Sequence, residues 1–200
     1  MTNPVSSVAT FKETPSQTAG PYVHSGFLPA HAGLNLRTQE KLNILTGEGV
    51  EGEPIRIEGA VYDGAGALVR DAVIETWQAD AKGRHNQSGF FGWGRAAADA
   101  TSGDWHIETI KPGRVAWQDG RPQAPHVSLI IFARGINIHL HTRLYFEDEA
   151  EANAADPVLT LVDAHLRPSL IAKKSKRGSE TVYRLDIVLQ GDNETVFFDM

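Results

Sequence analysis

The fold is decided by one stretch of sequence, Ala124-Pro-His-Val-Ser-Leu-Ile-Ile-Phe-Ala-Arg-Gly-Ile-Asn-Ile-His-Leu-His-Thr-Arg-Leu-Tyr-Phe146. Its first half, residues 126–132, is a run of apolar, β-favouring residues that predicts a strand buried on both faces. Residues 133–135, Ala-Arg-Gly, predict a turn. Residues 138–146 then alternate and predict a second strand. We therefore expect a β-hairpin at the centre of the protein.

The sequence on both sides of this hairpin predicts further strands. Residues 55–62 alternate with period two and run into the turn Asp63-Gly-Ala-Gly66. Four more strands are expected at residues 72–78, 103–109, 181–190 and 195–198. Residues 80–100 are rich in Gly, Asn and small residues, which predicts a long connecting loop. The basic run at 173–179 predicts a solvated turn.

Helix signals are few. Residues 147–155 begin with acidic residues, contain good helix formers and stop before Pro157, so they are the strongest helix candidate. A helical turn at 168–172 and a short helix around 37–45 are weaker candidates.

This pattern predicts an all-β protein with a β-sandwich core, an irregular N-terminal extension and few short helices. We expect the sandwich to span residues 55–200 and the N-terminal arm and extension to span residues 1–54. Within the extension, residues 13–24 contain two prolines and Gly20, which oppose regular structure, yet also carry Tyr22. We expect an ordered irregular segment that lies on a surface.

Composition excludes several functions. The chain has 200 residues, a formal charge of −6 and no cysteine. The charge gives no basic surface for nucleic acid or an anionic membrane. The absence of cysteine excludes disulfides, thiolate zinc sites and cysteine nucleophiles. No signal-peptide pattern and no apolar run of about 20 residues is present, so we expect a cytoplasmic protein without a membrane span.

Three histidines of the hairpin suggest a metal site. His139 and His141 are two residues apart, so they would share one face of a strand, and His126 begins the preceding strand. Imidazole pairs of this kind are common metal ligands, and one alternative is a hydrolase that uses these three residues. The other reading is that they are structural histidines. No Gly-X-Ser-X-Gly motif, phosphate-binding loop or dinucleotide fingerprint is present.

Other motifs carry a resemblance to a known family. They are Ile57-X-Gly59-X-Val61-X-Asp63-X-X-Gly66, Val69-X-Asp71-Ala72-X-Ile74-Glu75-X-Trp77-Gln78-Ala79-Asp80-X-X-Gly83, Ile110-Lys-Pro-Gly113, Pro125-His126 and Leu144-Tyr145-Phe146. With them the chain resembles the intradiol ring-cleaving dioxygenases over roughly residues 13–200. The resemblance implies a β-sandwich and the cleavage of a catechol-type aromatic acid by O2 between its two hydroxyl carbons.

The resemblance also implies a ligand set, and this chain departs from it. Catalytic members hold Fe(III) with two tyrosines and two histidines. The matching positions here are His85, Val115, His126 and Ser128, so one ligand of four keeps its identity. We therefore expect no metal site and no catalytic residue in this chain alone. The whole chain is most similar to the family's non-iron-binding subunit, whose homologous beta subunit holds the iron in a hetero-oligomer.

In such a complex the resemblance places the substrate pocket at the subunit interface. It implies that Thr18, Gly20, Pro21 and Tyr22 line this pocket. Arg134, in the hairpin turn, is expected to meet a substrate carboxylate. Alternatively, Arg134 pairs with an acidic residue at the interface, and Arg143 meets the carboxylate instead. A different alternative is a non-enzymatic β-sandwich that binds a ligand or acts as a scaffold.

Overall fold

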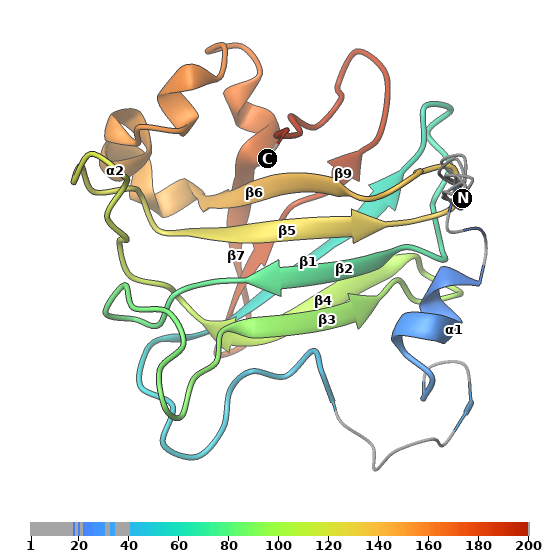
Figure 1. Ribbon diagram of the computed structural model, residues 1–200, viewed down its shortest axis with the longest axis horizontal. Coiled ribbons are helices and arrows are strands. Elements are labelled where there is room, and N and C mark those ends of the chain that lie inside the picture. The colour runs from blue at the N-terminus through green and yellow to red at the C-terminus, as the bar shows by residue number, and fades with distance from the viewer. Residues whose placement is uncertain (1–17, 19, 21, 31–32, 35–40, 200) are drawn as a thin grey trace, which may run out of the picture.

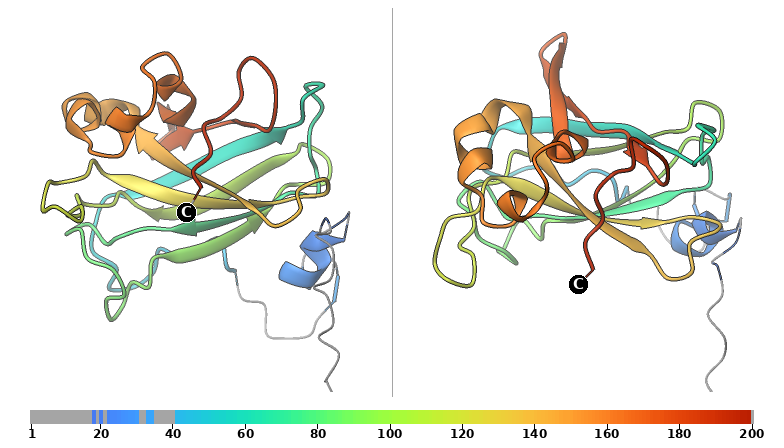
Figure 2. Two further views of the ribbon diagram at one scale, coloured as in Figure 1. Left: turned by 45° about the horizontal axis from the view of Figure 1, so that its top comes forward. Right: turned by 90° about the horizontal axis from the view of Figure 1, so that it is seen from above.

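The computed structural model describes residues 18, 20, 22–30, 33–34 and 41–199. Its strands form two layers (Figures 1 and 2). One layer has the order β3-β2-β5-β6 and the other β7-β8-β1-β4, with β9 paired to β1. The layers join where β6 pairs with β7 at Tyr145↔Ile171 and Phe146↔Ala172. The predicted all-β fold with few short helices is confirmed.

The strand bounds are as follows: β1 Pro54–Tyr62, β2 Val73–Trp77, β3 Trp93–Ala97, β4 Asp104–Ile110, β5 His126–Phe132, β6 Leu140–Phe146, β7 Ile171–Arg177, β8 Glu180–Arg184 and β9 Ile187–Val188. The core lies between the layers, because alternate side chains of each strand point inward. Its largest fully buried members include Trp105, Ile107 and Leu129. A second cluster, around Tyr145 and Leu170, fills the end beneath the helices.

The helical elements are α1 Val23–Phe27, η1 Glu147–Glu149, α2 Ala150–Ala155, η2 Leu159–Leu161 and η3 Arg167–Leu170. The prediction at 147–155 is confirmed as a 3-10 turn that continues into a short α-helix. The helical turn predicted at 168–172 is found at 167–170 as η3, and residues 171–172 begin β7. No helix of the described residues is long and apolar enough to cross a membrane.

Four local predictions are wrong. The loop predicted at 80–100 contains β3, and the turn predicted at 173–179 is largely β7. β7 is mostly exposed and pairs with β8, so its main-chain hydrogen bonds hold it in place without an apolar pattern. Residues 195–198 form no strand, and residues 41–45 are not helical. The rest of the helix predicted at 37–45 lies outside the described residues.

The first strand of the hairpin also differs from expectation. The bounds of β5 are as predicted, but its burial alternates rather than being complete on both faces. Val127, Leu129 and Ile131 face the core, whereas His126 and Ser128 lie on a half-buried outer face. The sequence did not indicate this alternation, because the outer face also carries apolar residues, Ile130 and Phe132.

Candidate functional site

The turn of the central hairpin meets the N-terminal segment. The backbone N–H of Gly135 donates a 2.7 Å hydrogen bond to Thr18 Oγ1, across 117 positions of sequence. The backbone N–H of Gly20 also approaches this oxygen, at 3.4 Å. Both contacts are exposed to solvent. Thr18, one of the residues predicted to line a pocket, is therefore held beside the turn that carries Arg134.

Helix α1 anchors the other end of this segment. The Phe27 ring packs on Phe132 with 4.6 Å between centroids, and the Arg95 guanidinium lies 4.7 Å from the Phe27 centroid. Arg95 Nη1 also donates to the Phe27 carbonyl oxygen at 2.8 Å. An ion pair with Glu75 holds Arg95 against the sheet. Aromatic and cation–π contacts thus fix α1 on the outer face of the β3-β2-β5-β6 layer.

Among the described residues between these two anchors, Tyr22 is exposed and Gly20 partly exposed, whereas Val23 is buried. Gly20 has a φ of +73°, a conformation that favours glycine, and nothing in the described structure lies within 4 Å of where its Cβ would be. Tyr22 is 78% exposed. Pro21, predicted to line the pocket, lies outside the described residues. We call Thr18, Gly20, Tyr22, Arg134 and Gly135 the hairpin corner; in Figure 1, α1 lies below the β5–β6 connection at this end.

Arg134 is exposed but held on one side. Its Nε donates to Asp71 Oδ2 at 2.6 Å, and the Asp71 side chain is buried. The arginine therefore does pair with an acid, although the acid belongs to this chain. Within the described residues, no hydrogen bond engages its Nη1 or Nη2. The outer edge of the guanidinium remains available to bind an anion.

Arg143 is in a different environment and does not fit the role of a replacement. It is only 7% exposed. Its Nη1 donates to Gln123 Oε1 at 2.8 Å, and Tyr145 links the group to the buried carboxylate of Asp156. Burial, followed by the electrostatic effects of Arg143 and Asp156, leaves the pKa of Tyr145 raised, so the phenol stays neutral. Arg143 belongs to an internal network rather than to the hairpin corner.

The four positions of the degenerate ligand set gather at the opposite end of β5. Ser128 pairs with Trp77 of β2, and the His85 ring stacks on Trp77 with 5.5 Å between centroids. The loops that carry His85 and Val115 pack closely, because a Cβ on Gly83 would lie 2.0 Å from the carbonyl oxygen of Arg114. The fold thus brings these positions near one another.

These residues do not fit a ferric ion. Val115 has no donor atom, Ser128 offers a neutral hydroxyl, and none of the four is a tyrosine. Burial, followed by the nearby charge of Arg143, lowers the pKa of His126 to about 4, so its ring is neutral. His126 Nδ1 lies 2.8 Å from the carbonyl oxygen of Ala124.

The alternative site of three histidines is wrong. Among the described residues, no group of three His, Cys, Asp or Glu side chains is arranged to hold a metal ion. His139 packs on Phe132 next to the turn, whereas His141 contacts Phe198. Burial, followed by the charge of Arg143, lowers the pKa of His141.

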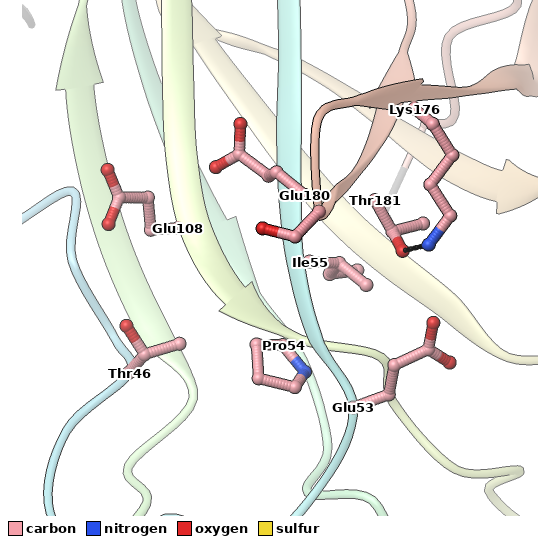
Figure 3. A pocket seen from close by; sticks show the side chains of 9 residues that line it. Thr46, Glu53, Pro54, Ile55, Glu108, Lys176, Glu180 and Thr181 are labelled. Carbon is pink, nitrogen blue, oxygen red and sulfur yellow. Dashed lines mark hydrogen bonds between the residues drawn. The ribbon is translucent and has the colours of Figure 1, made fainter.

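A separate groove does not resemble a site for an aromatic acid. Its volume is about 460 Å³, and it lies where the start of β1 faces the β7–β8 turn (Figure 3). Its charged lining residues are Glu53, Glu108, Glu180 and Lys176. The Lys176 ammonium is already bonded to Thr181 Oγ1 at 2.6 Å. Three carboxylates would repel an anionic ligand.

Sequence reasoning missed the residues that support the hairpin corner. Asp71 stands in one of the family motifs, but nothing in the sequence indicates its contact with Arg134. Neither Phe27 nor Arg95 belongs to a motif. One signal was present for Asp71: a short polar residue directly before an apolar strand. Its partner 63 positions away becomes visible only in the folded chain.

Comparisons with known proteins identify a family and similar chains. Residues 29–191 match a family described as dioxygenase. The chain is 51% identical over 193 residues to the protocatechuate 3,4-dioxygenase alpha chain of Pseudomonas putida, covering 94% of this chain and 96% of that one. It is also 32% identical over 161 residues to the protocatechuate 3,4-dioxygenase beta chain of Burkholderia cepacia, covering 72% of this chain and 67% of that one.

A solved structure has a similar fold. It is the dioxygenase domain of a dioxygenase–carbohydrate-binding protein fusion from Streptomyces sp. SirexAA-E, with a TM-score of 0.60 and 23% identity. The similarity covers 92% of this chain and all of that domain.

Proposed function

The chain belongs to the intradiol dioxygenase family, and we propose that it acts as the alpha subunit of a protocatechuate 3,4-dioxygenase. In the proposed complex, protocatechuate is cleaved by O2 between its two hydroxyl carbons to 3-carboxy-cis,cis-muconate. The similarity to an alpha chain over nearly the full length supports this function.

The iron of the proposed complex is Fe(III) held by a homologous beta subunit, not by this chain. The family uses iron, yet His85, Val115, His126 and Ser128 do not form a suitable ligand set. The resemblance between this chain and a beta chain supports a hetero-oligomer of two related subunits. This chain alone is then inactive.

The role of this chain is to line the substrate pocket and support the beta subunit. We assign the lining to Thr18, Gly20, Pro21, Tyr22 and Arg134, and we assign residues 1–54 to the subunit interface. The single observation that carries this proposal is the hydrogen bond from Gly135 to Thr18, because it joins the N-terminal segment to the turn of Arg134. The open edge of the guanidinium suits the carboxylate of protocatechuate.

Co-expression tests the proposal. The chain purified alone should show neither the visible absorption of tyrosinate bound to iron nor ring-cleaving activity, and co-expression with the beta chain should give both. Colour and turnover from this chain alone would contradict the assignment of iron to the partner.

The scaffold alternative is tested in the same complex. Deletion of residues 13–24 should raise the KM for protocatechuate if the segment lines the pocket. If the truncated complex assembles and turns over with unchanged KM, a purely supporting role is favoured instead.

A further inference from the structure

The backbone places Asp71 directly opposite Arg134. Strands β2 and β5 are antiparallel, and their register ends with Val73 opposite Phe132. Asp71 lies two residues before Val73, and Arg134 lies two residues after Phe132. The same register therefore puts Asp71 across from Arg134, just beyond the last paired residues. The 2.6 Å contact between Nε and Oδ2 is therefore set by the sheet itself and not by a chance approach of two surface side chains.

The two partners differ in burial. The Asp71 side chain is 8% exposed and the Arg134 side chain is 61% exposed. A buried carboxylate has few rotamers available, so it can act as a fixed point for a long, mobile side chain. A charge-assisted hydrogen bond to Nε also fixes the plane of the guanidinium and leaves Nη1 and Nη2 on the solvent side.

We propose that Asp71 is a positioning residue, which orients Arg134 so that its Nη edge meets the carboxylate of an aromatic acid. This inference rests on the proposed function, in which Arg134 contacts the substrate. Asp71 itself touches no ligand. Without it, Arg134 would keep its charge but would sample many rotamers, and each binding event would have to order the side chain.

An opposite effect of Asp71 has to be considered. Its negative charge lies on the far side of the guanidinium from the ligand and would repel the ligand carboxylate. Water around the exposed guanidinium screens this repulsion, whereas the orienting contact is short and partly shielded. We expect orientation to outweigh repulsion, so that removal of Asp71 weakens binding.

The test uses the complex of this chain with its co-expressed beta subunit. Two ligands are compared: protocatechuate, through its KM, and catechol, which lacks the carboxylate, through its inhibition constant. Asp71→Ala should raise the KM for protocatechuate roughly tenfold and leave kcat and the inhibition constant of catechol within about twofold. Asp71→Asn should have a smaller effect, because its amide oxygen can still accept the bond from Nε.

Coupling to Arg134 distinguishes positioning from a general loss of structure. Arg134→Gln alone should raise the KM for protocatechuate, and adding Asp71→Ala to it should change little more. Asp119→Asn is a matched control, since Asp119 accepts a 2.8 Å bond from Arg121 Nε away from the hairpin corner. This control should leave both ligands unaffected. Only variants that assemble with the beta subunit are compared, and Asp71→Asn provides the milder change.

The outcomes separate the two proposals. If Arg134→Gln selectively weakens protocatechuate but Asp71→Ala and Asp71→Asn do not, the positioning role is wrong and the pocket role of Arg134 stands. The positioning role is also wrong if Asp71→Ala tightens protocatechuate binding or weakens both ligands equally. If Arg134→Gln changes neither ligand, the pocket role of Arg134 fails, and the role of Asp71 fails with it.

Discussion

Phe27→Ala offers a direct test of whether the hairpin corner must be held in place. Phe27 lies outside the corner, but it anchors the segment that carries Thr18, Gly20 and Tyr22. The substitution removes the ring from its contacts with Phe132 and Arg95. It leaves the hydrogen bond between Arg95 and the backbone carbonyl of residue 27, so the anchor is weakened and not abolished.

The size of the effect follows from the contacts that are lost. A half-buried phenyl ring, an aromatic pair and a cation–π contact together stabilise the docked segment by roughly 2–3 kcal/mol. Local opening should become about 30- to 140-fold more frequent, because each 1.4 kcal/mol is a factor of ten. The sandwich core does not depend on these contacts, so its main unfolding transition should shift little.

Hydrogen exchange and steady-state kinetics on the assembled complex are the assays. Protection of the amides at residues 22–27 should fall by the stated factor, and the KM for protocatechuate should rise several-fold. Phe91→Ala is a control, because Phe91, although 63% exposed, is also a phenyl group that packs on an aromatic neighbour, Trp77. The reasoning is refuted if protection at residues 22–27 collapses while the KM stays at the wild-type value.

Three further predictions concern single contacts. Thr18→Val removes the acceptor of the Gly135 N–H, so we expect a rise of about threefold to tenfold in the KM of the complex and little change in thermal stability; an unchanged KM would contradict a role for this bond. Asp156→Ala removes a fully buried carboxylate that accepts from Tyr145 and from the backbone N–H groups of Ala124, Val158 and Leu159, and urea titration should show a loss of about 3 kcal/mol or more. Burial alone would raise the pKa of Asp148, but hydrogen bonds from Lys174, Lys111 and Tyr183 outweigh it and hold the pKa at about 2. Because this folded-state pKa lies below that of the unfolded chain, the stabilisation is complete above about pH 4 and is lost as the pH falls towards 2, so Asp148→Asn should flatten the acid limb of a stability–pH curve.

Much of the fold could be predicted from local pattern. The strands β1, β4 and β5 were predicted to within one residue at their starts, because alternating or apolar runs between turn residues have few other solutions. β7 was missed, since its exposed lysines carry no apolar pattern and its pairing with β8 decides its conformation. β3 was missed for a related reason: Gly94 and small residues weaken its pattern, and β2 supplies its hydrogen bonds.

The sequence by itself, through its resemblance to the intradiol dioxygenases, predicted that this chain lacks the ligand set of a catalytic subunit. The residues at 85, 115 and 128 are side chains with fixed chemistry, and no arrangement of the backbone gives valine a donor atom. Only the tertiary structure decided which of the two candidate arginines is available: Arg134 is exposed beside Thr18, whereas Arg143 is enclosed by Gln123 and Tyr145. Exposure and long-range pairing arise when distant segments pack together, so neither can be read from the residues next to each arginine in the chain.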